Sequence, residues 1–266
     1  EIASCLVGSE MCIRDSGIWA YTNERLCKDD LITVQIVENE CSDNIAPVNL
    51  PLDIAYEDDD IIVINKPFDM PAHPSAGNHD NTLANALMYY YGSQNKPFVY
   101  RCINRLDRDT TGLTIVAKHA LAGGILGNAV AKRAIHRTYY AVCSGCTPAC
   151  MRISAPIARK DASTIERCVD FKRGENAVTD FIRIKYNPDN NLSLVKLRLL
   201  TGRTHQIRVH MKYIGFPLIG DFLYNPDYTY ISRQALHSGR LVFTHPVTGQ
   251  KMNLISDIPS DMKSLF

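Results

Sequence analysis

The regular alternation of apolar and polar residues in the second half of the chain restricts the fold more than any other feature. In 193–200, the apolar residues Val195 and Leu197 alternate with Lys196 and Arg198. Successive side chains of a strand point to opposite faces, so this pattern predicts a strand with one buried and one wet face. Strands of this kind are typical of antiparallel sheets. Further strands are predicted at 138–143, 178–186, 241–245 and 251–255.

The first half of the chain adds a fully apolar strand and helices. The segment 61–64 reads "IIVI" and is followed by Lys66 and Pro67, which end the strand. The stretch 82–91 predicts a helix that begins at an Asn81 cap. Further helices are predicted at 119–134, where three glycines weaken the pattern, and at 204–214. We therefore predict an α+β fold with a mixed, mostly antiparallel sheet in one main domain.

Four segments are distinguished along the chain. Residues 1–16 fit neither a helical nor a strand period and resemble translated adapter sequence, so we expect them to be foreign to the natural protein. Residues 17–41 include an alternation that starts at Ile32 and predicts a strand at the end of an incomplete small module. Two prolines and several polar residues predict a linker at 42–53, and the main domain then takes up 54–266.

Charge is unevenly distributed along this nearly neutral chain. The net charge of +1 argues against a histone-like or tail-driven binder of polyanions. Between Arg101 and Tyr140, however, there are seven Lys and Arg residues and only two Asp residues, and 196–220 holds five basic residues and no acidic one. The two basic segments predict a local surface for an anionic ligand. Ordinary solvated faces are the alternative.

The composition also predicts where the protein works and what it does not bind. No segment approaches the roughly 18 apolar residues of a membrane-spanning helix, and nine irregularly spaced cysteines predict reduced thiols. We therefore expect a monomeric cytoplasmic protein that does not contact a membrane. Cys143, Cys146 and Cys150 are spaced like part of a zinc site, but no second Cys/His pair lies nearby at a suitable spacing. We expect them to be structural thiols, and we expect no metal.

A charged cluster directly precedes an apolar strand in "INRLDRDTTGLTIVAK", residues 103–118. A buried charge is costly unless it is paired, so two carboxylates and two arginines in this place need an explanation. Asp107 could be a reactive carboxylate beside a ribose, kept ionised by a cation such as Arg208. Asp109 fits a turn in which its side chain accepts hydrogen bonds from the backbone. Spacing alone leaves the catalytic and the turn interpretation of this pair open.

The predicted helix at 204–214 places basic residues on one face. His205, Arg208 and Lys212 share that face, while Ile207 and Met211 lie on another. A helix of this kind packs through its apolar side and presents hydrogen-bond donors to an anion; a solvated basic face is the alternative. The five-residue step from His205 to His210 is not the spacing of a zinc protease.

Several motifs together resemble one known family. "NRLDRDTTGLTIVAK" is similar to the RLD motif of the RluA-type pseudouridine synthases, and other segments follow in the order of that family. They read "DDDIIVINKPFDMPAHP", "AIHRTYYAVCSG", "LLTGRTHQIRVHMKYIGFPLIGD" and "LHSGRLVFTHPVTGQ". The resemblance covers 54–266 and implies a catalytic domain of the pseudouridine synthase type. Residues 17–40 resemble the end of an S4-like RNA-binding module.

The resemblance implies the reaction, the partner and the roles of individual residues. It implies isomerisation of uridines in structured RNA after base flipping, without cofactor or metal. Large-subunit ribosomal RNA is the expected partner, with tRNA as the alternative. By motif, Asp107 is the catalytic carboxylate, Tyr139 lies under the target base, and Arg208 pairs with Asp107. The residues expected to bind RNA are Arg105, which would insert into the base stack, and Arg203, His205, Gln206 and Lys212.

The sequence departs mildly from the family, and other functions stay open. Asn104 stands where many members have His, Thr111 where Ser is commoner, and Arg137 where Lys is usual. An RNA-binding protein whose catalytic pocket is unused is one alternative. A nucleoside or sugar hydrolase is another, and it would need a second positioned carboxylate.

Overall fold

The computed structural model describes residues 12–20, 25, 27–35, 41–42, 44–75, 77–161 and 165–266. The strands of the main domain are β4 (Ile54–Glu57), β5 (Ile61–Lys66), β6 (Arg101–Cys102), β7 (Thr111–Ala117), β8 (His136–Ser144), β9 (Cys150–Ser154), β10 (Ile157–Arg159), β11 (Arg167–Val169), β12 (Val178–Asn187), β13 (Leu192–Leu199), β14 (Leu236–Thr244) and β15 (Lys251–Ile255). Its helices are α1 (Leu83–Gly92), α2 (Ala120–Ala131), α3 (Gln206–Tyr213) and α4 (Ser260–Lys263).

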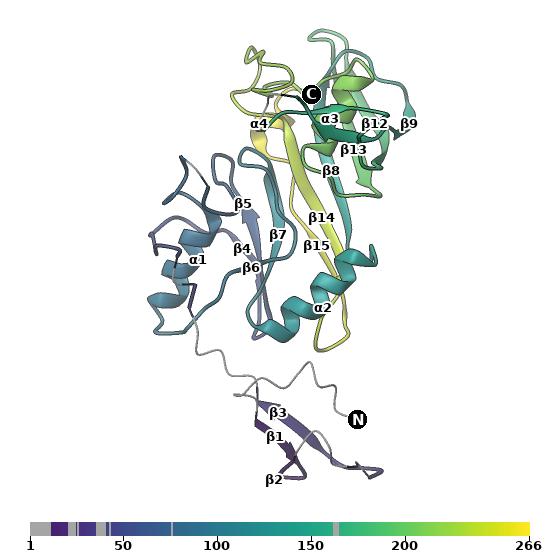
Figure 1. The fold of residues 1–266 in the computed structure, drawn as a ribbon. Coiled ribbons are helices and arrows are strands. Elements are labelled where there is room, and N and C mark those ends of the chain that lie inside the picture. Colours follow the sequence, from purple (N-terminus) through teal and green to yellow (C-terminus); the bar gives the residue numbers. More distant parts are fainter. Residues whose placement is uncertain are drawn as a thin grey trace.

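One mixed sheet of ten strands organises the described part of this domain. Its order is β4-β5-β7-β14-β8-β13-β12-β9, with β6 beside β7 and β15 beside β14. The pair β7–β14 is parallel, and the other pairs described in the sheet are antiparallel. In Figure 1, the long strands β8 and β14 connect the half of the sheet that carries α1 to the half that carries α3. The predicted α+β class with a mostly antiparallel sheet is confirmed.

Helices cover both faces of the sheet at β5, which explains why that strand is apolar throughout. Ile61 packs in one core cluster with residues of α2, and Ile62 packs in another with residues of α1. A strand covered on both faces needs no polar side, whereas an antiparallel strand with one wet face alternates. Such alternation occurs in β13, where Val195 and Leu197 are fully buried and the residues between them and after them are exposed.

The core that carries the site lies under α3. Ile207 and Met211 of this helix are buried against residues of β8, β12 and β13, and Ile214 is partly buried in the same cluster. This agrees with the apolar face predicted for the helix. The opposite face does not behave as a solvated surface throughout, because Arg208 is only 1% exposed.

Several boundaries differ from the predictions. The cap of α1 is Thr82 and not Asn81: Thr82 and Asn85 form a capping box, which satisfies two backbone donors at the helix start. Strand β14 begins five residues before the predicted 241, since its first residues gain partners in β7 and β8. The predicted linker 42–53 contains no helix or strand among its described residues, yet its apolar side chains pack beside α1.

A second, three-stranded sheet precedes the main domain. It contains β1 (Cys12–Asp15), β2 (Ile18–Trp19) and β3 (Ile32–Gln35), in the order β2-β1-β3. The predicted strand from Ile32 is confirmed to residue 35, and residue 36 lies outside the described residues. Although 1–16 shows no strand period, Cys12–Asp15 forms a strand that pairs in register with β3. A partner strand supplies the backbone hydrogen bonds that no local period reveals. The foreign origin of 1–16 and the incomplete S4-like module stay predictions.

Candidate active site

The charged motif forms a loop, 103–110, that is fastened to the strand after it. Asn104 Oδ1 accepts a hydrogen bond from the backbone N–H of Ile115 at 2.8 Å, and its Nδ2 donates to the carbonyl oxygen of Leu113 at 3.3 Å. Thr114 Oγ1 donates to the carbonyl oxygen of Asn104 at 2.6 Å. Asn104 is 3% exposed, so water competes little for these bonds. They hold the loop rigidly against β7.

A buried lysine supports the loop from the neighbouring strand. Lys66 Nζ donates to three backbone carbonyl oxygens, at 2.7 to 2.8 Å, those of Pro67, Met70 and Arg108. Burial lowers the pKa of Lys66 to about 7, while the negative charges of Asp109 and Asp107 act in the opposite direction. The three donors of an ammonium group match the three acceptors. Lys66 therefore ties the end of β5 to the loop that carries Asp107.

The glycine of the motif allows two strands to approach. Gly112 has φ +105°, and a Cβ atom at this position would lie 2.3 Å from the carbonyl oxygen of Ser238 in β14. A residue with a side chain would clash there and would also be strained. Gln234, just before β14, donates from Nε2 to Thr110 Oγ1 at 2.6 Å. The loop is thus held between β7 and the segment leading into β14.

Arg208 of α3 joins two carboxylates that are far apart in the sequence. Its Nε and Nη2 donate to the two oxygens of Asp221 at 2.7 and 2.8 Å, and its Nη1 donates to Asp107 Oδ2 at 3.0 Å. Arg208 is 1% and Asp221 0% exposed, whereas the side chain of Asp107 is 30% exposed. Burial acts to lower the pKa of Arg208, but the hydrogen bonds to Asp221 and the charge of Asp107 outweigh it, so the pKa is raised. Arg208 is a permanent cation behind an accessible Asp107.

Aromatic rings and a histidine complete the surroundings of this ion pair. The guanidinium carbon of Arg208 lies 5.0 Å from the ring centre of Tyr224 and 5.3 Å from that of Phe222. His205 Nε2 is 3.9 Å from Asp107 Oδ2, and its Nδ1 bonds the hydroxyl of Tyr224 at 2.9 Å. Burial lowers the pKa of His205, and the positive charge of Arg208 adds to this effect against the charge of Asp107. The lowered pKa favours the neutral form of His205, and Arg208 supplies the charge that balances Asp107.

Asp107 opens into a cavity of about 960 Å³ between the loop, α3 and the sheet. Among the described residues that line it, Asp107 is the sole carboxylate. Seven arginines line the same cavity: Arg105, Arg108, Arg133, Arg137, Arg198, Arg203 and Arg208. Arg108, Arg203 and Arg208 pair with carboxylates outside this lining. The other four arginines leave the cavity positively charged, so it attracts a polyanion and offers it one carboxylate as nucleophile or base. Hydrolysis by a pair of carboxylates, as in most glycosidases, does not fit this lining.

Comparison with known proteins places these features in a family. The family model described as RNA pseudouridylate synthase matches residues 60–213. The chain belongs to the RNA pseudouridylate synthase family. It is similar to the "Uncharacterized RNA pseudouridine synthase YjbO" of Bacillus subtilis, with 41% identity over 91% of this chain and 84% of that protein. It is also 41% identical to the "Ribosomal large subunit pseudouridine synthase D" of Haemophilus influenzae, over 87% of this chain and 75% of the relative. The chain is thus an RNA pseudouridine synthase, an enzyme that converts uridine to pseudouridine.

Solved structures agree with this family and with its fold. "Human RNA Pseudouridylate Synthase Domain Containing 1" superposes with a TM-score of 0.66 at 26% identity, over 78% of this chain and 83% of the human one. "Human RNA Pseudouridylate Synthase Domain Containing 4" gives 0.65 at 20% identity, over 79% and 90% of the two chains, which concerns the fold alone. The α+β catalytic domain predicted from the motifs is therefore that of a pseudouridine synthase.

The structure brings most of the predicted site residues of this pseudouridine synthase to one cavity. Tyr139, on β8, is 4% exposed and lines the cavity together with Asp107 and Arg208. The exposed Arg105 lines it from the loop, and Arg203 lines it from the turn before α3. His205 belongs to the lining as well, at its ion-pair end.

The two other residues predicted to bind RNA are Gln206, whose side chain is bonded within the protein, and Lys212, which lies outside the described cavity lining. Gln206 is 2% exposed, and its side chain is used within the protein. Its oxygen accepts from Thr201 Oγ1 and the N–H of Arg203, and its nitrogen donates to the carbonyl of Val178 and to Thr179 Oγ1. Gln206 belongs to the cavity lining, but its side chain fixes the turn before α3, and its assignment to RNA binding stays a prediction. Lys212 is exposed but lies outside the described lining of the cavity.

Two further residues of the site, Asp221 and Lys66, are not predicted from the sequence. Asp221 is the first acid after the basic segment 196–220, and a buried arginine in a helix requires such a partner. The apolar run of β5 indicates Lys66 only as the end of a strand. A lysine two residues after such a run, on the same strand, can have a side chain that starts in the core, which is the signal that could have indicated a buried anchor.

Neither of the two candidate metal sites has the ligands that a metal requires. Asp58, Asp60 and His245 lie close enough together to share an ion. However, His245 Nδ1 accepts from the backbone N–H of Thr248 at 3.1 Å, which leaves the ring proton on Nε2, and Nε2 donates to Asp58 at 2.8 Å. The ring therefore has no free lone pair for a metal. Cys143, Cys146 and Cys150 form no such group within the described part of the chain.

The three cysteines of the suspected zinc spacing are free thiols. Cys143 is buried, which raises the pKa of its thiol, while Cys146 and Cys150 are exposed. The prediction that they are structural thiols stays a prediction. As for the membrane, no helix among residues that the structure describes has the length and apolar character needed to cross one.

Proposed function

We propose that this pseudouridine synthase acts on large-subunit ribosomal RNA and uses Asp107 as its only reacting carboxylate. One observation carries the proposal: Asp107 is the sole carboxylate among the described residues of a cavity that seven arginines line. A base-modifying enzyme that breaks and remakes one glycosidic bond needs one carboxylate and a polyanion-binding surface, not two carboxylates and a water. The name of the Haemophilus influenzae relative supports ribosomal RNA as the partner.

The proposed reaction conserves every atom of the nucleoside apart from exchanged protons. The bond from C1′ to N1 breaks, the uracil turns within the cavity, and a bond from C1′ to C5 forms. The proton at C5 leaves to solvent and N1 takes up a proton. Asp107 either attacks C1′ or removes the proton at C2′, and both routes require an ionised carboxylate. Arg208 Nη1 lies 3.0 Å from Asp107 Oδ2 and supplies the cation that pairs with this carboxylate.

The target uridine must leave the base stack to reach Asp107. Tyr139 offers a flat apolar surface in the cavity wall, on which an extruded base can stack. Arg105 stands two residues before Asp107 and is exposed at the cavity, so it is placed to fill the gap that the uridine leaves. His205 and Arg203 remain candidates for contacts with the flanking backbone, and Lys212 for a more distant one.

The role of Arg105 predicts a kinetic effect that differs from that of a simple phosphate contact. An inserted side chain acts after the RNA has bound, so Arg105→Ala is expected to slow the single-turnover rate at saturating RNA by about tenfold or more, while affinity falls less. The measurement is rapid-quench analysis of pseudouridine formation in a stem-loop RNA. Arg133→Ala, which also removes an arginine of the cavity lining, is the control. A wild-type rate for Arg105→Ala would leave Arg105 as a phosphate contact only.

The proposed substrate is tested by mapping pseudouridines in total RNA from cells with and without the gene. We expect one or a few large-subunit ribosomal sites to disappear with the gene and to return with the wild-type protein, but not with Asp107→Asn. If only sites in tRNA disappear, the substrate is tRNA and the proposal of ribosomal RNA is wrong. A cytoplasmic location follows from a ribosomal substrate and stays a prediction, as does the monomeric state.

A further inference from the structure

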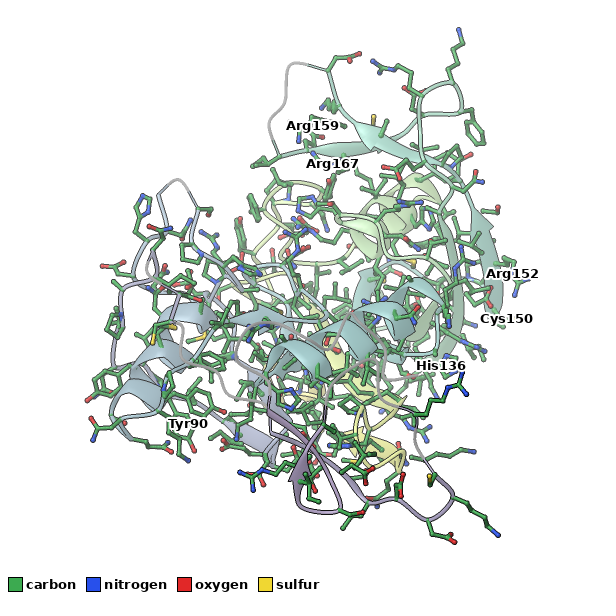
Figure 2. All side chains as sticks on the ribbon, turned by 60° about the horizontal axis from the view of Figure 1, so that its bottom comes forward. Tyr90, His136, Cys150, Arg152, Arg159 and Arg167 are labelled. Atoms are coloured by element: carbon green, nitrogen blue, oxygen red, sulfur yellow. The ribbon has the colours of Figure 1, made fainter. Side chains whose placement is uncertain are left out.

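The small hairpin formed by β10 and β11 holds two arginines directly opposite each other. Its two strands pair with one another only, among the described strands, and the register sets Arg159 against Arg167. Both are labelled in Figure 2, where they lie side by side on this hairpin. Like charges in directly opposite positions of an antiparallel pair destabilise it. A bound anion would remove that repulsion.

Neither guanidinium is neutralised within the described residues. Arg159 is exposed and makes no hydrogen bond or ion pair among them. Arg167 is half-buried, and its Nη1 donates to two backbone carbonyl oxygens at 3.1 Å, those of Ile165 and Glu166. No carboxylate in the described part of the chain lies within ion-pair distance of either side chain. The hairpin therefore carries two uncompensated positive charges.

These two arginines line a second cavity, of about 500 Å³, together with Arg173 and Arg203. The latter pair differs, because both are neutralised by carboxylates. Arg173 pairs with Asp161 and Asp170, and Arg203 pairs with Glu175, which is the sole carboxylate lining this cavity among the described residues. What remains for a ligand is the unpaired charge of Arg159 and Arg167.

The second cavity adjoins the active site. Gly202, Arg203 and Thr204 line both cavities. The backbone N–H of Arg167 donates to the hydroxyl of Tyr224 at 2.9 Å, and the ring of Tyr224 lies under Arg208. The hairpin is thus joined to the arginine that holds Asp107. An RNA strand that leaves the active site past residues 202–204 enters the second cavity.

We propose that Arg159 and Arg167 bind a backbone phosphate of the substrate RNA that flanks the target uridine. This inference rests on the proposed function, since it takes RNA as the polyanion. A guanidinium presents two parallel donors to phosphate oxygens, and two guanidinium groups on one hairpin can hold a phosphate from two sides. The contact positions the RNA backbone without reading a base.

The test is the double variant Arg159→Gln, Arg167→Gln, which keeps polar side chains and removes both charges. Measured by fluorescence anisotropy with a stem-loop RNA that the wild type isomerises, affinity is expected to fall by about tenfold or more, because charge-assisted hydrogen bonds to a phosphate are stronger than neutral ones. The slope of log affinity against log salt is expected to become shallower by about 0.7–0.9 for each phosphate that the variant no longer neutralises. The single-turnover rate at saturating RNA should stay at the wild-type value.

The matched control is Arg152→Gln, Arg240→Gln, which removes the same charge from exposed strand positions outside both cavities. Arg152 is labelled on β9 in Figure 2. We expect the control to change the affinity and the salt slope much less than the hairpin variant does. If affinity fell equally in the two variants, the hairpin arginines would contribute only general surface charge, and the proposal would be overturned.

Two further measurements separate a phosphate site from a structural role and from failure of the proposed function. Without RNA, the single variant Arg159→Gln should melt no lower than the wild type, since repulsion is relieved and the Arg159 side chain makes no hydrogen bond among the described residues; a lower melting temperature would assign this arginine to the fold instead. A single neutral methylphosphonate is placed at successive positions of the RNA. At one or two positions it should weaken binding to the wild type, whereas binding to the hairpin variant should not change at those positions. A variant with the wild-type profile contradicts the phosphate site alone, whereas a wild type that neither binds nor isomerises RNA contradicts the proposed function too.

Discussion

Asp107→Asn is expected to abolish isomerisation while leaving the fold and RNA binding nearly intact. The amide has the shape of the carboxylate, and its oxygen can still accept the hydrogen bond that Arg208 Nη1 donates at 3.0 Å. It can neither attack C1′ nor take a proton, however. We expect the rate to fall by at least about a thousandfold, within the range for removal of a reacting acid–base group.

The measurement is release of tritium from RNA labelled at C5 of uridine, since that hydrogen leaves only when C5 bonds to C1′. Asp109→Asn is the matched control from the same motif. Asp109 pairs with Arg108 and is absent from the described lining of the active-site cavity, so its substitution should cost far less activity. Substantial turnover by Asp107→Asn, or an equal decrease in both variants, would remove Asp107 from the chemistry.

Arg208→Ala is expected to lower both stability and activity. It leaves the fully buried Asp221 without a cation, with only the backbone N–H groups of Leu223 and Tyr224 donating to it. Removing one partner of a buried ion pair costs about 3–5 kcal/mol of the free energy of unfolding. For a domain of this size, each kcal/mol lowers the melting temperature by about 2–4 °C. Activity should disappear as well, because Asp107 then has no ion-pair partner.

Two variants make this prediction specific. Lys212→Ala, one turn further along α3 and exposed, should change the free energy of unfolding by no more than about 0.5 kcal/mol. The double variant Arg208→Met, Asp221→Ala removes both charges and should recover much of the stability, since an apolar replacement of a buried ion pair is often neutral. It should not recover activity. If calorimetry found Arg208→Ala and Lys212→Ala equally mild, the buried ion pair of Arg208 would not contribute to stability as predicted.

Local sequence patterns are sufficient to predict those strands in which apolar residues follow a clear pattern. The alternation around Val195 predicts β13, and the apolar run from Ile61 predicts β5, because these patterns follow directly from which face of a strand is buried. The short strands β9, β10 and β11 are not predicted. Three to five residues hold too little of a period, and such strands exist through their partners.

The site, too, could be predicted from the sequence only in part. The motifs place Asp107, Tyr139 and Arg208 in one active site, and the structure brings these three residues together at one cavity. The side chain of Gln206 could not be placed from sequence, since whether a polar residue at a helix start faces RNA or the protein depends on what packs beside it. Its partners come from β12, more than twenty residues away in the chain.

The sequence by itself therefore determined the family, the strand and helix periods, and the chemical types available to the site. Only the tertiary structure decided that Arg208 also pairs with the buried Asp221, that Lys66 supports the loop that carries Asp107, and that one carboxylate stands alone in the described lining of its cavity. The physical reason is that burial and ion pairing depend on contacts between distant segments. Residues 107 and 208 are brought together by the packing of α3 against the sheet, which no local spacing encodes.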